Sequence, residues 1–348
     1  MKIPVGILGA TGTVGQRFIQ LLENHPWFEI TWMAASDRSA QKTYTDACKW
    51  RLSTPLAAHI AAMKVSSAVP EDAPKLIFAA LDSAAATELE PRFAAAGCAV
   101  VSNSSSFRMQ EDVPLVIPEV NSDHLELLKT QKWYKDSGGF IVTNPNCSAI
   151  GLVMALAPLH RRFGVEKVFV ATMQAVSGAG YPGVASLDIL GNVIPYIANE
   201  EPKMEAESRK LLGTLNGNSV VPADLAVSAH CNRVAVEDGH TESVSLKLRR
   251  TAPAEEIIST WNSFRCTAQK LKLPSAPQQP IIYDPTPDRP QPRLDIHRGA
   301  GMSAVVGRLR PCNLFDWKFT VLSHNTIRGA AGAAVLNGEL LKAQGYLT

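Results

Sequence analysis

Cys147 has the surroundings expected of a catalytic nucleophile. It lies in the segment TNPNCS at 143–148, between a short β-rich stretch and an apolar, helix-compatible stretch at 149–159. A helix N-terminus presents unpaired N–H groups and a partial positive charge, which favours a thiolate and can hold a developing oxyanion. A cysteine taken alone is more often a buried apolar residue, but here two asparagines and a proline surround the sulfur with polar groups. We therefore predict nucleophilic catalysis by this thiol.

His240 is the leading acid/base candidate among the eight histidines. Histidine exchanges protons near neutral pH, although a lone histidine is more often structural. It follows a short strand-like stretch and an Asp-Gly turn, and it leads into a second strand-like stretch at 242–248, which is the pattern of a β-hairpin. Arg233 lies seven residues before it in the same segment.

A glycine-rich segment at the start of the chain predicts a dinucleotide site. The apolar run Ile3 to Leu8 ends at GATGTVG, residues 9–15, and apolar residues then recur at helical spacing. Glycines at these positions allow a tight turn, so a pyrophosphate can approach the helix N-terminus closely. The predicted contacts to the cofactor in this loop are Gly9, Thr11, Gly12, Thr13, Val14 and Gly15.

Three further loops carry candidate binding residues. Ser36, Arg38 and Ser39 follow the second predicted strand and offer donors and charge to a 2′-phosphate, which favours NADP over NAD, with Asp37 turned to solvent. Arg108 ends a serine-rich loop and can bind a phosphate or a carboxylate, although a solvated arginine is the commoner case. The flexible loop at 177–180, with Ser177 and Gly178, is placed to lie over a cofactor ring.

The elements that hold these residues alternate between strand and helix. Strand-like runs separated by helical segments such as 84–96 indicate a parallel, doubly wound sheet. These runs are 3–8, 28–35, 76–81, 99–102, 115–117 and 140–143. The alternating runs at 168–174, 302–309 and 315–322 indicate a largely antiparallel sheet in the second half. A helical segment at 252–271 and a proline-rich loop at 274–292, with no assigned role, lie between them.

The predicted fold is therefore α/β, with an N-terminal Rossmann-like domain and an α+β substrate and dimerisation domain. The first domain is predicted at 1–147 and the second at 148–324. A helix of small residues follows residue 324, so residues 325–348 are expected to return to the first domain. A chain of 348 residues is long enough for two cores.

Composition excludes several classes of partner. There are 34 basic and 32 acidic residues, a net charge of +2 and no basic run, so neither nucleic acid nor a membrane surface is expected as a partner. The six cysteines are scattered, which predicts neither a metal site nor a disulfide framework and fits a reducing compartment. No signal peptide or membrane-spanning segment is recognised, and we expect a cytoplasmic protein.

Together these motifs resemble the aspartate-semialdehyde dehydrogenase family, in its archaeal or fungal branch, over essentially the full length. The resemblance rests on four blocks in the same order: 9–15, 35–39, 144–148 and 233–240. It implies that Cys147 is the nucleophile, His240 the general acid/base and Gln174 the residue that orients the acyl intermediate. It further implies a set of binding roles: Arg233 for the substrate carboxylate, Glu200 for its amino group, Arg108 and Lys203 for phosphate, Ser36, Arg38 and Ser39 for the 2′-phosphate, and Asn325 for the nicotinamide amide.

The implied reaction is the reversible NADPH-dependent reduction of 4-phospho-L-aspartate to L-aspartate 4-semialdehyde and phosphate. It proceeds through a thioester and is a step towards lysine, methionine and threonine. The family habit implies a homodimer or homotetramer. Three alternatives remain. The first is a malonyl-CoA reductase, or a similar acyl reductase, on the same scaffold. An N-acetylglutamyl phosphate reductase is less expected because that family has a different sequence around its cysteine, and a silent NADP-binding paralogue is less expected because the catalytic residues are intact.

Overall fold

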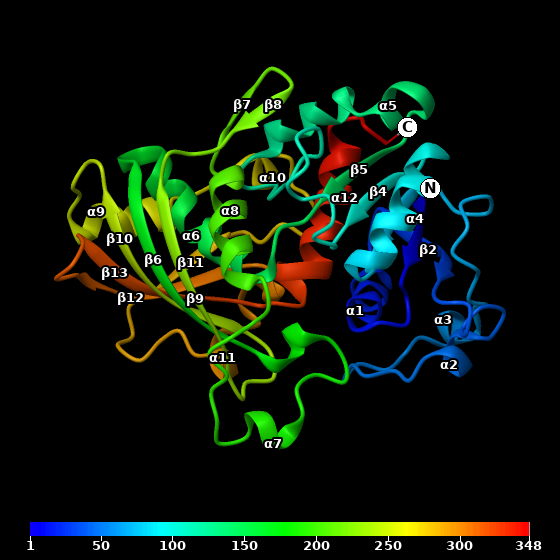
Figure 1. Ribbon diagram of the computed structural model, residues 1–348, viewed down its shortest axis with the longest axis horizontal. Coiled ribbons are helices and arrows are strands. Elements are labelled where there is room, and N and C mark those ends of the chain that lie inside the picture. The colour runs from blue at the N-terminus through cyan, green and yellow to red at the C-terminus, as the bar shows by residue number, and fades with distance from the viewer. Residues whose placement is uncertain (348) are drawn as a thin grey trace.

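The first half of the chain forms a five-stranded parallel sheet. The computed structural model describes residues 1–347 (Figure 1). The strand order is β2-β1-β3-β4-β5, and all pairs are parallel, as predicted. The strands are β1 Ile3–Leu8, β2 Phe28–Ala34, β3 Leu76–Ala79, β4 Ala99–Ser102 and β5 Phe140–Thr143. The strand predicted at 115–117 is wrong: Leu115 forms only an isolated bridge to Thr143, because Pro114 and Pro118 cannot donate to a longer ladder.

Helices cover this sheet, and the C-terminal helix is one of them. The helices of this region are α1 Thr13–Leu22, α2 Tyr44–Ala47, α3 Ala58–Ala62, α4 Ser83–Ala95, η1 Ser122–Thr130 and α5 Lys132–Ser137. Helix α12, Gly332–Ala343, returns to the sheet, where an added Cβ at Gly338 would lie 2.9 Å from the Phe78 ring. Glu339 of α12 also contacts His25 at 2.8 Å. The exact limits of the two domains stay a prediction.

The second half forms a six-stranded mixed sheet in the order β11-β12-β13-β10-β6-β9. Three neighbouring pairs are antiparallel, and β11–β12 and β6–β9 are parallel. The strands are β6 Val165–Gln174, β9 Ala226–Arg233, β10 His240–Leu248, β11 Ile281–Asp284, β12 Ala304–Pro311 and β13 Trp317–Ser323. The largely antiparallel sheet is therefore confirmed, with a parallel pair at each edge.

Two local expectations in this half are wrong, and a third is refined. Strands β9 and β10 form no hairpin, because β6 lies between them and pairs with both. The proline-rich loop contains β11, which is an edge strand and so tolerates neighbouring prolines. The helical segment at 252–271 is two helices, α9 Ala254–Asn262 and α10 Thr267–Lys270.

Helix α6, Cys147–Phe163, lies at the centre of the molecule. Thirteen of its residues are buried, which explains why its sequence is apolar on most faces. Helix α8, Glu200–Leu211, packs against it, and so does the π-helical turn η4, Ile327–Ala331. The remaining short elements are η2 Val176–Ala179, α7 Ser186–Ile189, β7 Thr214–Asn216, β8 Ser219–Val221, α11 Pro292–Asp295 and η3 Arg298–Gly301.

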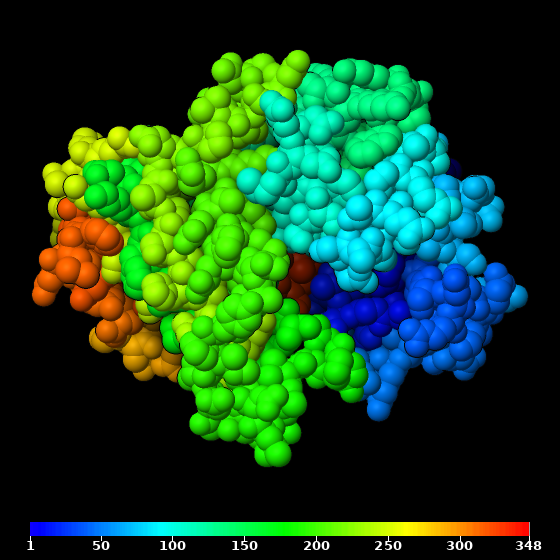
Figure 2. Space-filling view, viewed as in Figure 1, coloured from blue at the N-terminus to red at the C-terminus, as the bar shows by residue number. Residues whose placement is uncertain are grey.

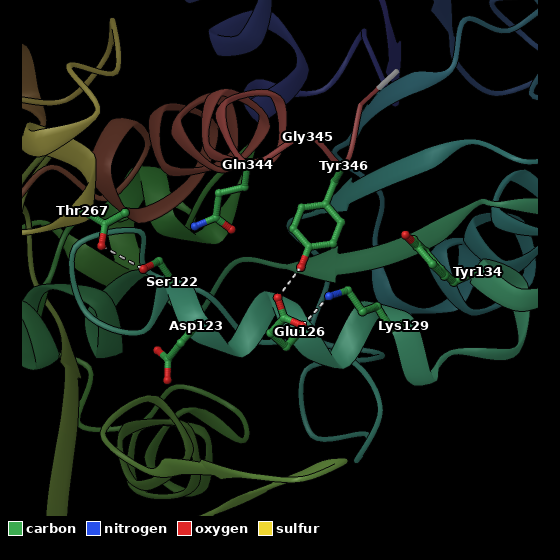
Figure 3. A pocket seen from close by; sticks show the side chains of 9 residues that line it. All are labelled: Ser122, Asp123, Glu126, Lys129, Tyr134, Thr267, Gln344, Gly345 and Tyr346. Carbon is green, nitrogen blue, oxygen red and sulfur yellow. Dashed lines mark hydrogen bonds and ion pairs between the residues drawn. The ribbon is translucent and has the colours of Figure 1, made fainter.

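The surface is hollowed between the two sheet regions, and the red C-terminal segment is visible at the bottom of the hollow (Figure 2). A separate cavity of about 550 Å³ lies beside the C-terminus, where the Tyr346 hydroxyl donates to Glu126 at 3.2 Å (Figure 3). None of the predicted site residues lines that cavity.

Within residues 1–347, every helix is too short or too polar to cross a bilayer.

A buried ion pair fixes the η4 turn to the first half of the chain. Both side chains of the pair, Arg328 and Glu119, are fully buried and form two bonds of 2.7 Å. Removing one partner leaves an uncompensated buried charge, so we expect Glu119→Gln to lower the free energy of unfolding by about 3–5 kcal/mol. Denaturant unfolding measures this change. The matched control is Glu88→Gln, which removes an exposed pair with Arg92, and equal small shifts in the two variants would contradict the expectation.

Candidate active site

Cys147 lies at the junction between β5 and α6, as predicted. It is the first residue of α6, and Asn146 caps the helix by accepting bonds from the backbone N–H groups of Ser148 at 2.9 Å and Ala149 at 3.0 Å. Gly329 of η4 packs directly on the cysteine, since an added Cβ there would lie 2.8 Å from the Cys147 Cβ. The cap and this contact fix the position of the sulfur.

His240 is the immediate partner of the thiol. The Cys147 Sγ and His240 Nε2 atoms are 3.2 Å apart, and the backbone N–H of Ala175 donates to Nδ1 at 3.1 Å. Because Nδ1 accepts this bond, the neutral ring carries its proton on Nε2. His240 therefore presents an N–H donor to the sulfur and to any oxygen bound beside it.

Burial favours the neutral form of both members of this pair. Burial, helped by the charges of Arg233 and His324, lowers the pKa of His240 to about 3. Burial and the nearby Glu200 raise the pKa of Cys147 to about 12, against the opposing charges of Arg108 and Arg233. Loss of solvent thus opposes the thiolate that the helix N-terminus is expected to favour.

A cavity of about 570 Å³ gathers the predicted substrate residues around Cys147 and Gln174, while His240 is fully buried behind the thiol and does not line it. They come from both halves of the chain. The predicted residues that line it are Cys147, Gln174, Arg108, Glu200, Lys203, Arg233, Thr13, Val14, Ser177, Gly178 and Asn325. An adjoining cavity of about 690 Å³ is lined by Thr11, Gly12, Thr13 and Val14. Thr13 and Val14 line both cavities. The two cavities therefore meet at the glycine loop.

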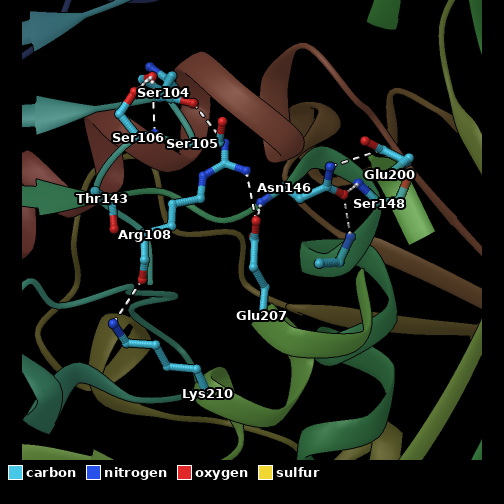
Figure 4. A network of polar contacts seen from close by, with 12 residues as sticks. Ser104, Ser105, Ser106, Arg108, Thr143, Asn146, Ser148, Glu200, Glu207 and Lys210 are labelled. Atoms are coloured by element: carbon cyan, nitrogen blue, oxygen red, sulfur yellow. Dashed lines mark hydrogen bonds and ion pairs between the residues drawn. The ribbon is translucent and has the colours of Figure 1, made fainter. Parts of the chain in front are cut away.

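The cations of the cavity are held in place by neighbouring polar groups. Arg233 donates to the carbonyl of Ala175 at 2.8 Å, and an added Cβ at Gly178 would lie 2.9 Å from its guanidinium. The guanidinium of Arg108 donates to Glu207 at 3.0 Å (Figure 4). Burial lowers the pKa of Arg233, and the nearby Glu200 carboxylate opposes this shift. The site can therefore hold two separate anionic groups.

The glycine loop has the shape that a pyrophosphate site requires. Gly9 has a φ of +86°, a conformation that side chains rarely adopt. An added Cβ at Gly15 would lie 2.3 Å from the carbonyl oxygen of Gly9, so only glycine allows α1 to start this close to β1. Gly9 and Gly15 thus shape the loop, while the residues between them line the cavity.

The predicted 2′-phosphate residues do not line either cavity. Ser36, Arg38 and Ser39 lie in the loop after β2, and Ser36 and Arg38 are exposed. Lys49 and Arg51 line the cavity instead, and the sequence reasoning missed them because no motif marks them. The guanidinium of Arg51 lies 3.7 Å from the ring centre of Tyr181, a residue of the loop that reaches over from the second half.

Asn325 joins the loop over the cavity to the strand that carries His240. Its side chain donates to the Ser177 hydroxyl at 2.8 Å and accepts from the backbone N–H of Gly239 at 2.8 Å. Gln174 is buried and donates to Thr172 at 3.3 Å.

Three residues near the thiol were missed by sequence reasoning: the side chain of Asn146, Glu207 and Gly329. The first could have been found as a helix cap, while the others depend on contacts between distant segments.

Comparison with known proteins identifies the family of this chain. Two family models match it: "Semialdehyde dehydrogenase, NAD binding domain" over residues 4–128 and "Semialdehyde dehydrogenase, dimerisation domain" over residues 156–328. The aspartate-semialdehyde dehydrogenase of Archaeoglobus fulgidus is 51% identical over 346 residues, 98% of each chain. The Saccharomyces cerevisiae enzyme is 46% identical and also covers 98% of each chain. The chain belongs to the aspartate-semialdehyde dehydrogenase family.

Solved structures of this family share the fold. The crystal structure of the Candida albicans aspartate-semialdehyde dehydrogenase with NADP has a TM-score of 0.92 and 44% identity, covering 99% of this chain and 100% of that one. The aspartate-semialdehyde dehydrogenase II of Vibrio cholerae, complexed with ASA, has a TM-score of 0.77 and 27% identity, with 98% coverage of each chain. The resemblance inferred from the four motifs is thereby confirmed.

Proposed function

We propose that this protein catalyses the reversible NADPH-dependent reduction of 4-phospho-L-aspartate to L-aspartate 4-semialdehyde and phosphate, as a step towards lysine, methionine and threonine. The observation that supports it most is the 3.2 Å contact between the Cys147 sulfur and His240 Nε2, at the edge of a cavity that Cys147 lines together with two arginines and that meets the glycine loop. The family membership established above supports the same reaction.

Cys147 is proposed as the nucleophile of a two-step acyl transfer. In the reductive direction its sulfur attacks the acyl phosphate carbon, the C–O bond to phosphate breaks to give a thioester, and the thiol proton leaves with the phosphate. After reduction of the thioester carbonyl, the resulting oxyanion accepts a hydrogen bond from His240 Nε2–H. Collapse of this oxyanion then breaks the C–S bond and releases the aldehyde, and the departing sulfur takes up a proton from solvent to return the thiol.

Substrate binding is assigned to the charged side chains around the thiol. Arg233 would hold the α-carboxylate and Glu200 the amino group, while Arg108 and Lys203 would bind the phosphate. Gln174 would orient the acyl group from the end of β6. Three cations and one anion line the cavity, which suits a small substrate that carries two anionic groups and an amine.

NADP, when bound, supplies or accepts the hydride. The loop at Gly9–Gly15 fits its pyrophosphate, and the cavity beside Ser177, Gly178 and Asn325 leaves room for the nicotinamide near the thiol. Arg38, with Ser36 and Ser39, remains the proposed 2′-phosphate group. The protein is further proposed to act as a homodimer or homotetramer, supported by the match to a dimerisation domain.

The test is NADPH absorbance with purified protein, NADP⁺, phosphate and L-aspartate semialdehyde. We expect NADPH to form only when phosphate is present. Malonyl-CoA with NADPH is the control for the alternative substrate. NADPH consumption with malonyl-CoA, and none of the phosphate-dependent reaction, would replace the proposed substrate but keep the thioester chemistry. Binding of NADP without turnover of any of these substrates would favour a silent paralogue.

A further inference from the structure

Glu207 links three segments that meet at the active site. It lies on α8, and its two carboxylate oxygens accept bonds from the Arg108 guanidinium at 3.0 Å and from the backbone N–H of Asn146 at 2.6 Å (Figure 4). Arg108 belongs to the loop after β4, and Asn146 immediately precedes Cys147. One carboxylate therefore contacts both the proposed phosphate-binding arginine and the backbone beside the nucleophile.

The surroundings of Glu207 favour a geometric role over a simple packing role. The residue is 1% exposed, and burying a carboxylate is costly unless charged or backbone donors satisfy it. An apolar side chain would fill the same space at lower cost. Glu207 instead forms two charge-assisted bonds in different directions, which restrict where its partners can lie.

The rest of the network strengthens this restriction. Lys210, one turn further along α8, donates to the backbone carbonyls of Arg108, Gln110 and Val113 at 2.7–3.0 Å. Arg108 also donates to the carbonyl of Asn103 at 2.7 Å. At the start of the same helix, Glu200 accepts a bond from the side chain of Asn146 at 2.9 Å. Helix α8 thus holds the Arg108 loop at one end and the Cys147 loop at the other.

We infer that Glu207 is a positioning residue that sets the separation between the anion-binding guanidinium of Arg108 and the sulfur of Cys147. This inference rests on the proposed function, because it takes phosphate as the anion at Arg108. Attack of phosphate on a thioester requires the phosphate oxygen at a defined distance from the acyl carbon. The Glu207 carboxylate also offsets part of the Arg108 charge, so its removal does not weaken the attraction of Arg108 for phosphate.

These two effects predict a specific kinetic pattern for Glu207→Gln. The amide keeps the size of the side chain but presents an NH₂ group to one of two donors, so one bond is lost. We expect kcat for phosphate-dependent oxidation to fall about 10- to 100-fold because the reacting groups are misplaced. The KM for phosphate should stay the same or fall. A purely structural role would lower thermal stability without this split between kcat and KM.

Glu205→Gln is the matched control. Glu205 lies on the same helix and accepts a bond from the backbone N–H of Ala229 at 3.1 Å, away from the thiol. Its replacement should leave kcat within about twofold of the wild type. If Glu207→Gln does not give folded protein, Glu207→Asp keeps the charge but shortens the side chain, and the same pattern is expected.

Alkylation of Cys147 by iodoacetamide, without substrate, gives a second readout that does not depend on the proposed reaction. We expect its rate to change about threefold or more in Glu207→Gln, because Asn146 loses the bond that holds the residue before the cysteine. Unchanged alkylation together with a wild-type kcat would overturn the inference. A raised KM for phosphate at unchanged kcat would also overturn it. If wild-type protein has no phosphate-dependent activity, the proposed function fails, while the alkylation rate still decides the role of Glu207.

Discussion

Replacing Cys147 by serine is expected to reduce kcat by about 10⁴-fold or more. A hydroxyl is a weaker nucleophile than a thiol at the same position, and an ester is a poorer acyl donor than a thioester. The contact with Gly329 leaves little room for another group to take over the position of the sulfur. Steady-state rates of NADPH formation measure the loss of kcat. The mass of the protein after incubation with acyl donor shows whether an acyl group stays bound as an ester.

Cys312→Ser is the control for this substitution. Burial raises the pKa of the Cys312 thiol, but the backbone N–H groups of Phe315 and Leu314 outweigh this effect and lower it. We therefore expect Cys312 to react with thiol reagents as well as Cys147. Its replacement should leave kcat unchanged. A Cys147→Ser enzyme with more than about a tenth of the wild-type rate would show that another group is the nucleophile.

The protonation state of the Cys147 thiol can be measured from the pH dependence of its alkylation. Because the pKa of Cys147 is raised to about 12, the free enzyme holds a thiol at neutral pH. In the Cys312→Ser background, the alkylation rate should therefore rise with pH through about pH 9 without a plateau. A plateau beginning near pH 7 would show that the helix N-terminus does stabilise a thiolate.

The sequence was sufficient where structure depends on neighbouring residues. The glycine loop, β4 and β5 all follow from short segments whose apolar pattern and turn residues agree. The strand at 115–117 failed because two prolines override an apolar pattern. The hairpin before His240 failed for another reason: insertion of β6 between β9 and β10 is a long-range pairing that no local pattern records.

The same distinction separates the site residues that could be predicted from those that could not. Cys147 and His240 have functional residue types in suggestive settings, and the structure brings them to 3.2 Å. Glu207 lies in a helix whose first turns are rich in charge, so its sequence looks like a solvated surface. Its burial depends on Arg108, 99 residues earlier, and becomes visible only in three dimensions.

His240 provides the second large expected effect. The N–H of Ala175 occupies Nδ1, so the ring is a neutral donor through Nε2, and burial keeps its pKa at about 3. A neutral donor of this kind stabilises an oxyanion by a hydrogen bond. We expect His240→Leu to lower kcat by about 10²- to 10⁴-fold.

His240→Gln separates this role from that of a titrating base. A glutamine amide can place an N–H donor near the former Nε2 position, so its loss in kcat should be about tenfold smaller than that of the leucine variant. Since a group with a lowered pKa is protonated only below that pKa, the wild-type kcat/KM should show no histidine titration between about pH 5 and about pH 8. An acidic limb with a midpoint near 6.5 that disappears in His240→Gln would contradict this assignment. Equal losses in the two variants would contradict it as well, because the donor would then contribute nothing.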